Sequence, residues 1–161
     1  MKNVLDINEA TKLSKQLKSE GKTIILVGGC FDILHPGHVQ FLKSAKEKGD
    51  VLLVTLESDR KITDLKGSER PLHTQEERAF MLTSLKYVDH GILLPFFSRN
   101  EQYDELITRI KPDVIATTEN DSHILHKKRQ AKRINAKVIE VIKYIPHKST
   151  TRLLKALEKE L

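Results

Sequence analysis

The segment GGCFDILHPGH, residues 28–38, holds three glycines, the chain's one cysteine, an aspartate and two histidines. It directly follows the apolar run TIILV, residues 23–27, which is typical of a buried strand. Gly28 and Gly29 permit a tight turn after that strand, and they let a ligand approach the backbone amides closely. We therefore begin with the chemistry that this segment could perform.

Two histidines of the segment flank Pro36 and Gly37. Pro36 suits the first position of a helix, because a missing N–H needs no partner there. His35 is then expected at the helix cap and His38 in the first turn, near the positive end of the helix dipole, where anions are favoured. Two imidazole donors and a helix terminus aimed at one spot predict a polyphosphate site.

Other interpretations of these residues stay open. Neither a P-loop nor a G-x-G-x-x-G motif follows the strand. His35, His38 and Asp32 could bind a metal, although the sequence offers no pair of cysteines and no acidic set nearby to complete a zinc site. The two histidines could also only cap and pack. Cys30 is expected to be a small packed residue, because only the histidines near it in sequence could activate its thiol.

The rest of the chain alternates between extended and helical patterns. Strands are expected over residues 23–29, 51–57, 88–94, 113–117 and 137–142. Helices are expected over residues 6–21, 36–49, 101–110, 121–135 and 149–161, with one more that starts at a capping box of Thr74 and Glu77. The charged stretch SDRKITDLKGSERP, residues 58–71, is expected to be a loop.

These elements predict an α/β fold: one three-layer, Rossmann-like domain over residues 1–161, with a mostly parallel five-stranded sheet and helices on both faces. The N-terminal helix, residues 1–21, is expected to pack on it. Ligands of such sheets bind at the carboxyl ends of the strands, where the strand order reverses. The GGCFDILHPGH segment follows one such end.

Composition narrows the class of protein. The length of 161 residues suits one domain, and the net charge of +6 suits phosphate-bearing ligands. One cysteine, an N-terminus without an apolar signal core and the absence of a membrane-length apolar run predict a cytoplasmic protein without a membrane partner. The basic segment HKKRQAKR, residues 126–133, is the best case for nucleic-acid binding, but it lacks interleaved aromatics, so a solvated helix face is favoured.

HPGH after GGCFD resembles the H-x-G-H signature of the cytidylyltransferase-like nucleotidyltransferases. KSTTR, residues 148–152, is similar to that superfamily's second motif and is also expected at a helix N-terminus. The lead helix running into the first motif, the LKGSERP loop, the EERAFMLTSLKYVD segment and IKPDVIA resemble the heptose-1-phosphate adenylyltransferase branch. Glycerol-3-phosphate cytidylyltransferases and archaeal-type FAD synthetases are similar but more distant.

The resemblance implies an enzyme that transfers a nucleotidyl group from ATP or CTP to a phosphorylated small acceptor, with a heptose-type sugar 1-phosphate as the first choice. The acceptor phosphate would attack the α-phosphorus directly and release pyrophosphate. Mg²⁺ would be held mainly by the triphosphate, without a metal site on the protein. A homodimer is compatible with the resemblance. A catalytically silent nucleotide sensor and a nucleic-acid-binding module are the alternatives that are not enzymes.

The resemblance also implies roles for individual residues. The implied catalytic residues are His35, His38 and Lys66. The implied nucleotide-binding residues are Gly29, Cys30, Phe31, His35, His38, Ser149, Thr150 and Thr151. The implied substrate-binding residues are Asp32, Lys66 and Arg78.

Some of these residues also have simple structural interpretations, and two segments differ from the family pattern. Lys66 could be an ordinary loop lysine, Arg78 could form a surface ion pair, and Ser149 would be a good helix N-cap with any ligand. The segments ATTENDS, residues 116–122, and YIPHK, residues 144–148, depart from the family pattern where base and acceptor are contacted. The identity of both therefore stays open.

Overall fold

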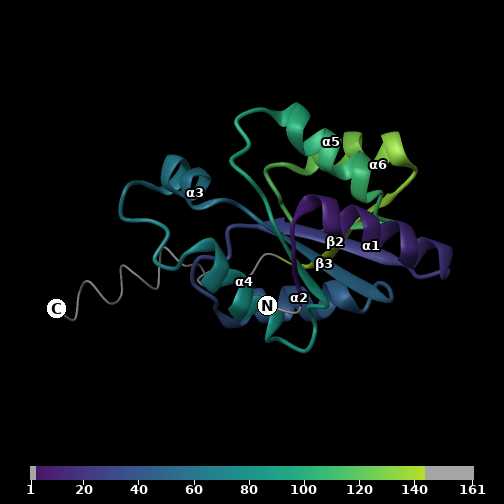
Figure 1. Cartoon of the computed structure of the whole chain (residues 1–161), viewed down its shortest axis with the longest axis horizontal. Helices are drawn as coiled ribbons and strands as arrows, with labels where there is room; N and C mark the ends of the chain where they lie inside the picture. The colour runs from purple at the N-terminus through teal and green to yellow at the C-terminus, as the bar shows by residue number, and fades with distance from the viewer. Residues whose placement is uncertain (1–2, 144–161) are drawn as a thin grey trace.

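Six parallel strands form one sheet in the order β1-β4-β3-β2-β5-β6 (Figure 1). The computed structural model describes residues 3–143, so the predicted helix over 149–161 and the KSTTR motif lie outside the described residues. The strands are β1 (Val4–Leu5), β2 (Ile24–Gly29), β3 (Val51–Leu56), β4 (His90–Leu93), β5 (Val114–Thr118) and β6 (Lys137–Ile142). The predicted α/β fold with a parallel sheet is confirmed.

The prediction of five strands is wrong by one, because β1 joins the sheet at its edge. This strand has two residues, and it pairs Val4 with Gly91 and Leu5 with Ile92 of β4. Two residues are too short to show an alternating pattern in the sequence. The strand forms because the open edge of β4 offers backbone hydrogen-bond partners, and this edge is created by the tertiary structure.

The described helices are α1 (Ile7–Ser19), α2 (Pro36–Lys46), α3 (Asp59–Lys66), α4 (Gln75–Thr83), α5 (Asn100–Ile110) and α6 (Ile124–Ile134). Both predicted capping boxes are present, at Asp6 with Glu9 for α1 and at Thr74 with Glu77 for α4. Helices α1, α5 and α6 cover one face of the sheet, while α2 and α4 cover the other (Figure 1). No helix among residues 3–143 is long and apolar enough to cross a membrane.

Helix α3 corrects the expectation of a loop over residues 58–71. The Ser58 side chain caps it by accepting from the Lys61 amide, and Ile62 anchors it as a fully buried side chain. One buried position in eight residues leaves the other faces to charged side chains. The strongly charged composition of the segment concealed this short helix in the sequence.

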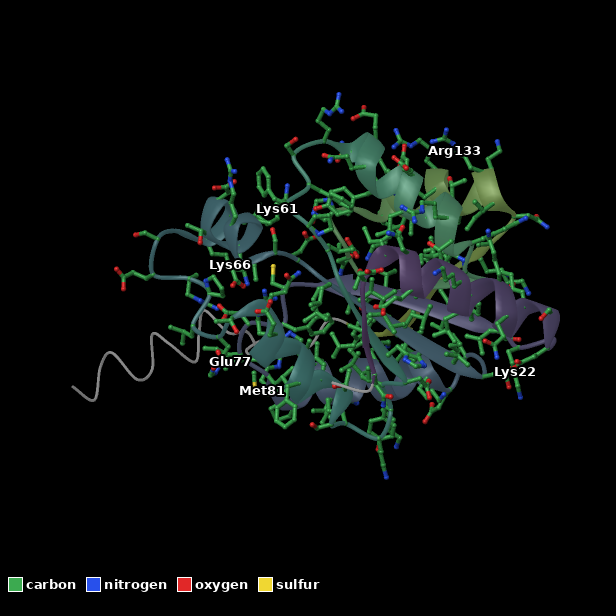
Figure 2. All side chains as sticks on the ribbon, viewed as in Figure 1. Lys22, Lys61, Lys66, Glu77, Met81 and Arg133 are labelled. Carbon is green, nitrogen blue, oxygen red and sulfur yellow. The ribbon has the colours of Figure 1, made fainter. Side chains whose placement is uncertain are left out.

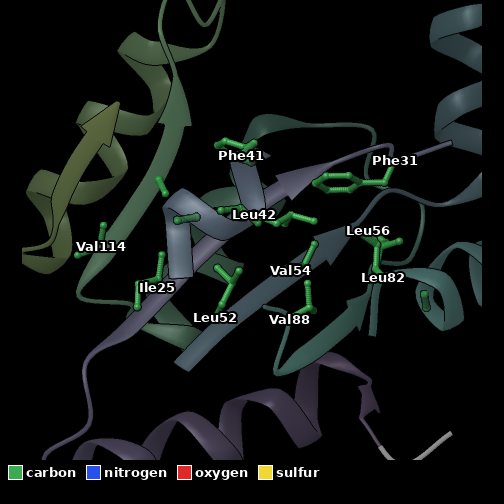
Figure 3. Packing of buried hydrophobic residues seen from close by; sticks show 14 residues of the cluster. Ile25, Phe31, Phe41, Leu42, Leu52, Val54, Leu56, Leu82, Val88 and Val114 are labelled. Atoms are coloured by element: carbon green, nitrogen blue, oxygen red, sulfur yellow. The ribbon is translucent and has the colours of Figure 1, made fainter. Parts of the chain in front are cut away.

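The core consists of two apolar layers, one on each face of the sheet. Ile25 and Val27 of β2 point into the layer under α2 and α4, whereas Ile24 and Leu26 point into the layer under α1 and α5. Figure 3 shows the first layer, in which Ile25 lies between Leu52 of β3 and Val114 of β5. A strand buried on both faces must be apolar throughout, which explains the unbroken TIILV run.

The strand order reverses at β2. The chain passes from β2 to β3 and β4 on one side of it, and then returns to place β5 and β6 on the other side. The carboxyl ends of β2 and β5 therefore flank a topological switch point, the usual ligand position in open parallel sheets. The GGCFDILHPGH segment begins at this point.

Candidate active site

The turn after β2 differs in detail from the predicted one. Strand β2 continues through Gly28 and Gly29, and the residue with left-handed backbone is Phe31, at φ 47°. A Cβ at Gly28 would lie 2.7 Å from Thr55 Oγ1, and one at Gly29 would lie 2.9 Å from the Phe31 ring. Glycine is needed at both positions because neighbouring side chains approach the backbone closely. The space left by the missing side chain of Gly29 is filled by the ring of the buried Phe31.

Helix α2 begins as predicted, with Pro36 at its first position and His35 at the cap. Pro36 has no N–H, and the His38 amide donates to the His35 carbonyl at 2.9 Å. The first turn therefore offers an anion fewer free amides than an ordinary helix terminus does. The imidazoles consequently have a larger share in any anion binding at this terminus.

The two imidazoles stack on each other. Their ring centroids lie 3.8 Å apart with 23° between the ring planes, and the His38 ring lies 5.3 Å from the Phe31 ring. Burial lowers the pKa of His38 to about 4, with further lowering by the positive charges of His35 and Lys66. His38 is therefore neutral at pH 7, and it can donate a single N–H.

Lys66 ends α3, and its side chain is exposed. Its charge lowers the pKa of His38 and also acts on the Cys30 thiol, so Lys66 faces the turn after β2. Lys61 and Lys66 both project from α3, which follows β3 at the carboxyl end of the sheet (Figure 2). Burial raises the pKa of Cys30, so its thiol is protonated at neutral pH and is a poor nucleophile.

Asp32 lies inside the protein and faces another loop. Its side chain is fully buried, forms an ion pair with the buried Arg70 and accepts a hydrogen bond from the Leu72 amide at 2.8 Å. Arg70 is itself held in place, because its backbone carbonyl accepts a hydrogen bond from Thr63 Oγ1 at 2.7 Å. The Asp32 carboxylate thus holds the loop after α3 against the turn after β2, and Arg70 is a partner that sequence reasoning missed.

Arg78 is completely buried, in contrast to the surface pair considered above. Its guanidinium donates to the carbonyls of Cys30 at 2.5 Å and Glu57 at 2.7 Å, and it forms an ion pair with Asp59 at 2.8 Å. These bonds tie α4 to the carboxyl ends of β2 and β3. Arg78 therefore contacts the turn from behind and positions the Cys30 backbone.

The ATTENDS segment forms a cap before α6. Asp121 accepts hydrogen bonds from Lys127 Nζ at 2.5 Å, from the His123 amide at 2.7 Å and from Thr117 Oγ1. Burial alone would raise the pKa of Asp121, but these donors lower it to about 2. This segment therefore has a structural function in positioning α6 beside the switch point.

The structure thus brings Gly29, Cys30, Phe31, His35 and His38 together after β2, with Lys66 facing them and with Asp32 and Arg78 bonded beneath. Ser149, Thr150 and Thr151 lie outside the described residues. Glu57 and Tyr103 adjoin this group, with Tyr103 Oη 3.0 Å from both carboxylate oxygens of Glu57. Nothing in the local sequence pattern marked this pair, because its members are 46 positions apart.

A parallel sheet with a switch point, followed by a histidine-rich helix terminus, defines a doubly wound α/β protein with a ligand site at the carboxyl edge. The cytidylyltransferase-like family model matches residues 26–156, and the chain belongs to that family. The family predicted from HPGH is thereby confirmed.

Relatives named bifunctional protein HldE match most of the chain. The one from Nitratiruptor is 37% identical over 96% of this chain, and the one from Wolinella succinogenes is 36% identical over 96%. These matches cover 32% and 31% of the two relatives, so the chain spans about a third of their length.

Two solved structures share the fold. The lipopolysaccharide core biosynthesis protein from Thermoplasma volcanium has a TM-score of 0.60 at 25% identity, covering 78% of this chain and 98% of its own. Pantoate–β-alanine ligase from Francisella tularensis, solved with β,γ ATP and β-alanine, has a TM-score of 0.68 at 17% identity. That match covers 97% of this chain and 77% of the ligase, and at this identity it supports the fold alone.

Proposed function

We propose that this chain transfers a nucleotidyl group from a nucleoside triphosphate, ATP in preference to CTP, to a heptose-type sugar 1-phosphate, with release of pyrophosphate. The observation that carries the proposal is the stacked His35–His38 pair at the start of α2, beside the β2 switch point and facing Lys66. The relatives named bifunctional protein HldE support this choice of acceptor.

The reaction is a single in-line displacement. An oxygen of the acceptor phosphate attacks the α-phosphorus of the triphosphate, and the bond from that phosphorus to the pyrophosphate oxygen breaks. No protein nucleophile is needed, which agrees with a protonated, half-buried Cys30 thiol. The protein has to align two anionic reactants and stabilise the charge that gathers on the departing pyrophosphate.

His35 and His38 are the proposed donors to the triphosphate and to the leaving pyrophosphate. The Gly29, Cys30 and Phe31 backbone would line the same spot, with Ser149, Thr150 and Thr151 contacting phosphates from outside the described residues. Lys66 would neutralise the acceptor phosphate. Arg78 and Asp32 would act indirectly, because their bonds to Cys30 and Arg70 hold the turn and the adjoining loop in place.

Mg²⁺ would accompany the triphosphate, shielding its charge and holding its geometry. Residues 3–143 contain no group of three His, Cys, Asp or Glu side chains placed to hold a metal ion. Magnesium bound to nucleotides usually keeps several waters and takes one or two protein carboxylates along with phosphate oxygens. The described residues therefore fit an ion that is held mainly by the phosphates.

Pyrophosphate release tests the proposal. The chain is incubated with Mg²⁺ and either ATP or CTP, together with a heptose 1-phosphate, glycerol 3-phosphate, FMN or no acceptor. We expect the fastest release with ATP and the heptose 1-phosphate. Release confined to FMN, or to CTP with glycerol 3-phosphate, would contradict the acceptor while keeping the reaction class.

Triphosphate binding without pyrophosphate release from any acceptor would instead favour a nucleotide sensor. Variants of His35 and His38 are compared with His126→Ala as the matched control. This change removes an exposed imidazole on α6, and the variant should behave as wild type. The homodimer stays a prediction, and size-exclusion chromatography with light scattering tests it.

A further inference from the structure

Glu57 is held in a fixed position at the carboxyl edge of the sheet. It follows β3 directly, its amide donates to the Gly29 carbonyl at 3.2 Å, and its carbonyl accepts from Arg78 at 2.7 Å. The backbone of Glu57 is thereby bonded to the residue before Cys30 and to the buried arginine. Its side chain starts from a rigid point beside the proposed triphosphate site.

The Glu57 side chain is half-buried, and no side chain among residues 3–143 forms an ion pair with its carboxyl group. Tyr103 Oη of α5 lies 3.0 Å from both carboxylate oxygens, and it is the one hydrogen-bond donor that residues 3–143 provide to them. A phenol has a single proton, so it donates to one carboxyl oxygen at a time. Burial raises the pKa of Glu57, although the hydrogen bond from Tyr103 and the charges of Lys61, Arg78 and His123 lower it.

Neighbouring side chains hold the Glu57–Tyr103 pair in a fixed position. The Tyr103 ring packs edge-to-face on Phe97 with centroids 4.9 Å apart, and Phe97 is buried. The Lys61 ammonium lies 5.9 Å from the centre of the Tyr103 ring and donates to the Phe97 carbonyl at 3.0 Å. The phenol is therefore held on two sides, and its hydroxyl is directed at Glu57.

Even partial burial of a carboxyl group with one neutral donor costs free energy, and an apolar side chain would pack there without that cost. The location, beside the turn after β2, indicates that the penalty is tolerated for ligand binding. The ligand group is not an anion, because a carboxylate would repel it. Mg²⁺ is placed with the triphosphate in the proposed function, and a further cation is disfavoured because the positive charges of Lys61 and Arg78 already act on this carboxyl group.

Neutral hydroxyl groups remain, since each can donate to the carboxylate oxygen that the Tyr103 hydroxyl leaves free. Building on the proposed function, we propose that Glu57, positioned by Tyr103, binds hydroxyl groups of the acceptor and selects a polyhydroxylated sugar phosphate. The arrangement of α3 supports the acceptor over the nucleotide. Glu57 lies two residues before α3, and Lys66, proposed for the acceptor phosphate, is the last residue of that helix, so the hydroxyl and phosphate contacts would come from one segment of the chain.

The test compares Glu57→Gln, Glu57→Ala and Tyr103→Phe with Glu105→Gln, a control that removes an exposed carboxylate on α5. With ATP and a heptose 1-phosphate, Glu57→Ala should raise the acceptor KM by about 10- to 100-fold, the usual effect of losing hydrogen bonds to a charged group. Tyr103→Phe should raise it by about 3- to 10-fold, and ATP binding should stay unchanged in all variants.

Selectivity separates this role from a structural one. The ratio of kcat/KM for the heptose 1-phosphate to that for glycerol 3-phosphate should fall in the Glu57 variants, because only the sugar offers ring hydroxyls. Equal losses for both acceptors would overturn the proposal. Weakened ATP binding with an unchanged acceptor KM would also overturn it, by assigning Glu57 to the nucleotide.

Failure of the proposed function is distinguished by a binding measurement. If no acceptor releases pyrophosphate, calorimetry with a non-hydrolysable ATP analogue and the heptose 1-phosphate still reports on Glu57. Binding by the wild type that is lost in Glu57→Gln supports the inference, whereas equal binding or no binding by both proteins overturns it. Where Glu57→Ala fails to fold, Glu57→Gln and Tyr103→Phe, which keep the side-chain volume, decide the matter.

Discussion

His38 is neutral in a site proposed for a polyanion. Protonation of His38 is unfavourable because its side chain is partly buried and lies near His35 and Lys66. A negative charge placed beside His38 would make its protonation more favourable. The phosphate groups of a bound nucleotide are such a charge. The proposed donors are thus held in position at a helix terminus, where they could respond to the charge that gathers on the leaving pyrophosphate.

His38→Ala should lower turnover by about 10²- to 10³-fold, because it removes one preorganised donor to the developing charge. ATP affinity should fall far less, since ground-state binding is shared with His35 and the backbone. Steady-state pyrophosphate release and ATP calorimetry provide the two numbers, with His126→Ala as the control. Near-normal turnover in His38→Ala would refute the catalytic role, and a protein that fails to fold would favour the capping interpretation.

The pKa of His38 also predicts an acid-dependent stability. The unfolded chain protonates this imidazole near its ordinary pKa of 6.5, whereas the folded chain resists until about 4. Between these values the unfolded state binds more protons, so the free energy of unfolding falls as the pH drops through this window. Urea denaturation at about pH 7.5 and about pH 5 should show a smaller loss in His38→Gln than in wild type. An identical loss in both proteins would contradict the lowered pKa of His38.

At the scale of elements, two arginines join the region between β3 and β4 to the turn after β2. Arg70 binds Asp32 from the loop after α3, and Arg78 reaches from α4 to the Cys30 carbonyl. Both arginines are buried, and both connect the proposed acceptor side to the proposed nucleotide side. The geometry of the site therefore depends on contacts between elements as well as on the H-x-G-H segment.

Arg78→Met should lower the free energy of unfolding by about 3–5 kcal/mol, because it leaves buried carbonyls and Asp59 without their donor. Urea denaturation measures the loss, and Lys128→Met, which removes an exposed lysine of α6, is the control. Unchanged stability combined with lost acceptor affinity would instead support direct contact between Arg78 and a substrate phosphate.

At the scale of the whole molecule, the net charge is +6, and several of the cations of the basic helix α6 form ion pairs. Asp104 of α5 pairs with Arg129 at 2.8 Å and Arg133 at 3.1 Å, and Asp121 pairs with Lys127 at 2.5 Å. The basic face of α6 thus has three of its cations beside carboxylates. This helix packs on α5 and β6, and its charges solubilise its outer surface.

We accordingly expect no salt-sensitive mobility shift with duplex DNA or RNA at physiological ionic strength. Nucleic-acid binding depends on cations that are free to displace counterions from phosphates, and three of these cations are already paired. A titration from low to physiological salt in a gel-shift assay checks this. A shift that persists at physiological salt and is lost in Lys128→Glu would revive the binding-module hypothesis.

The sequence by itself determined the class of fold and most element positions, and it located the segment for which the site is proposed. Apolar runs, the two capping boxes and Pro36 act within a few residues of one another, and each is present where its pattern predicted it. An unbroken apolar strand such as TIILV also requires cover on both faces, so even the three layers follow from local composition.

Tertiary structure alone decided how the side chains around the turn are used. Asp32 and Arg78 read as substrate contacts in the sequence, yet they bond to Arg70 and Cys30, 38 and 48 positions away. Glu57 meets Tyr103 across 46 positions, and β1 exists because β4 has an open edge. The physical reason is the same in each case. The partner of a buried polar group or of a strand edge is set by which elements the topology places side by side, and no local pattern of residues records that choice.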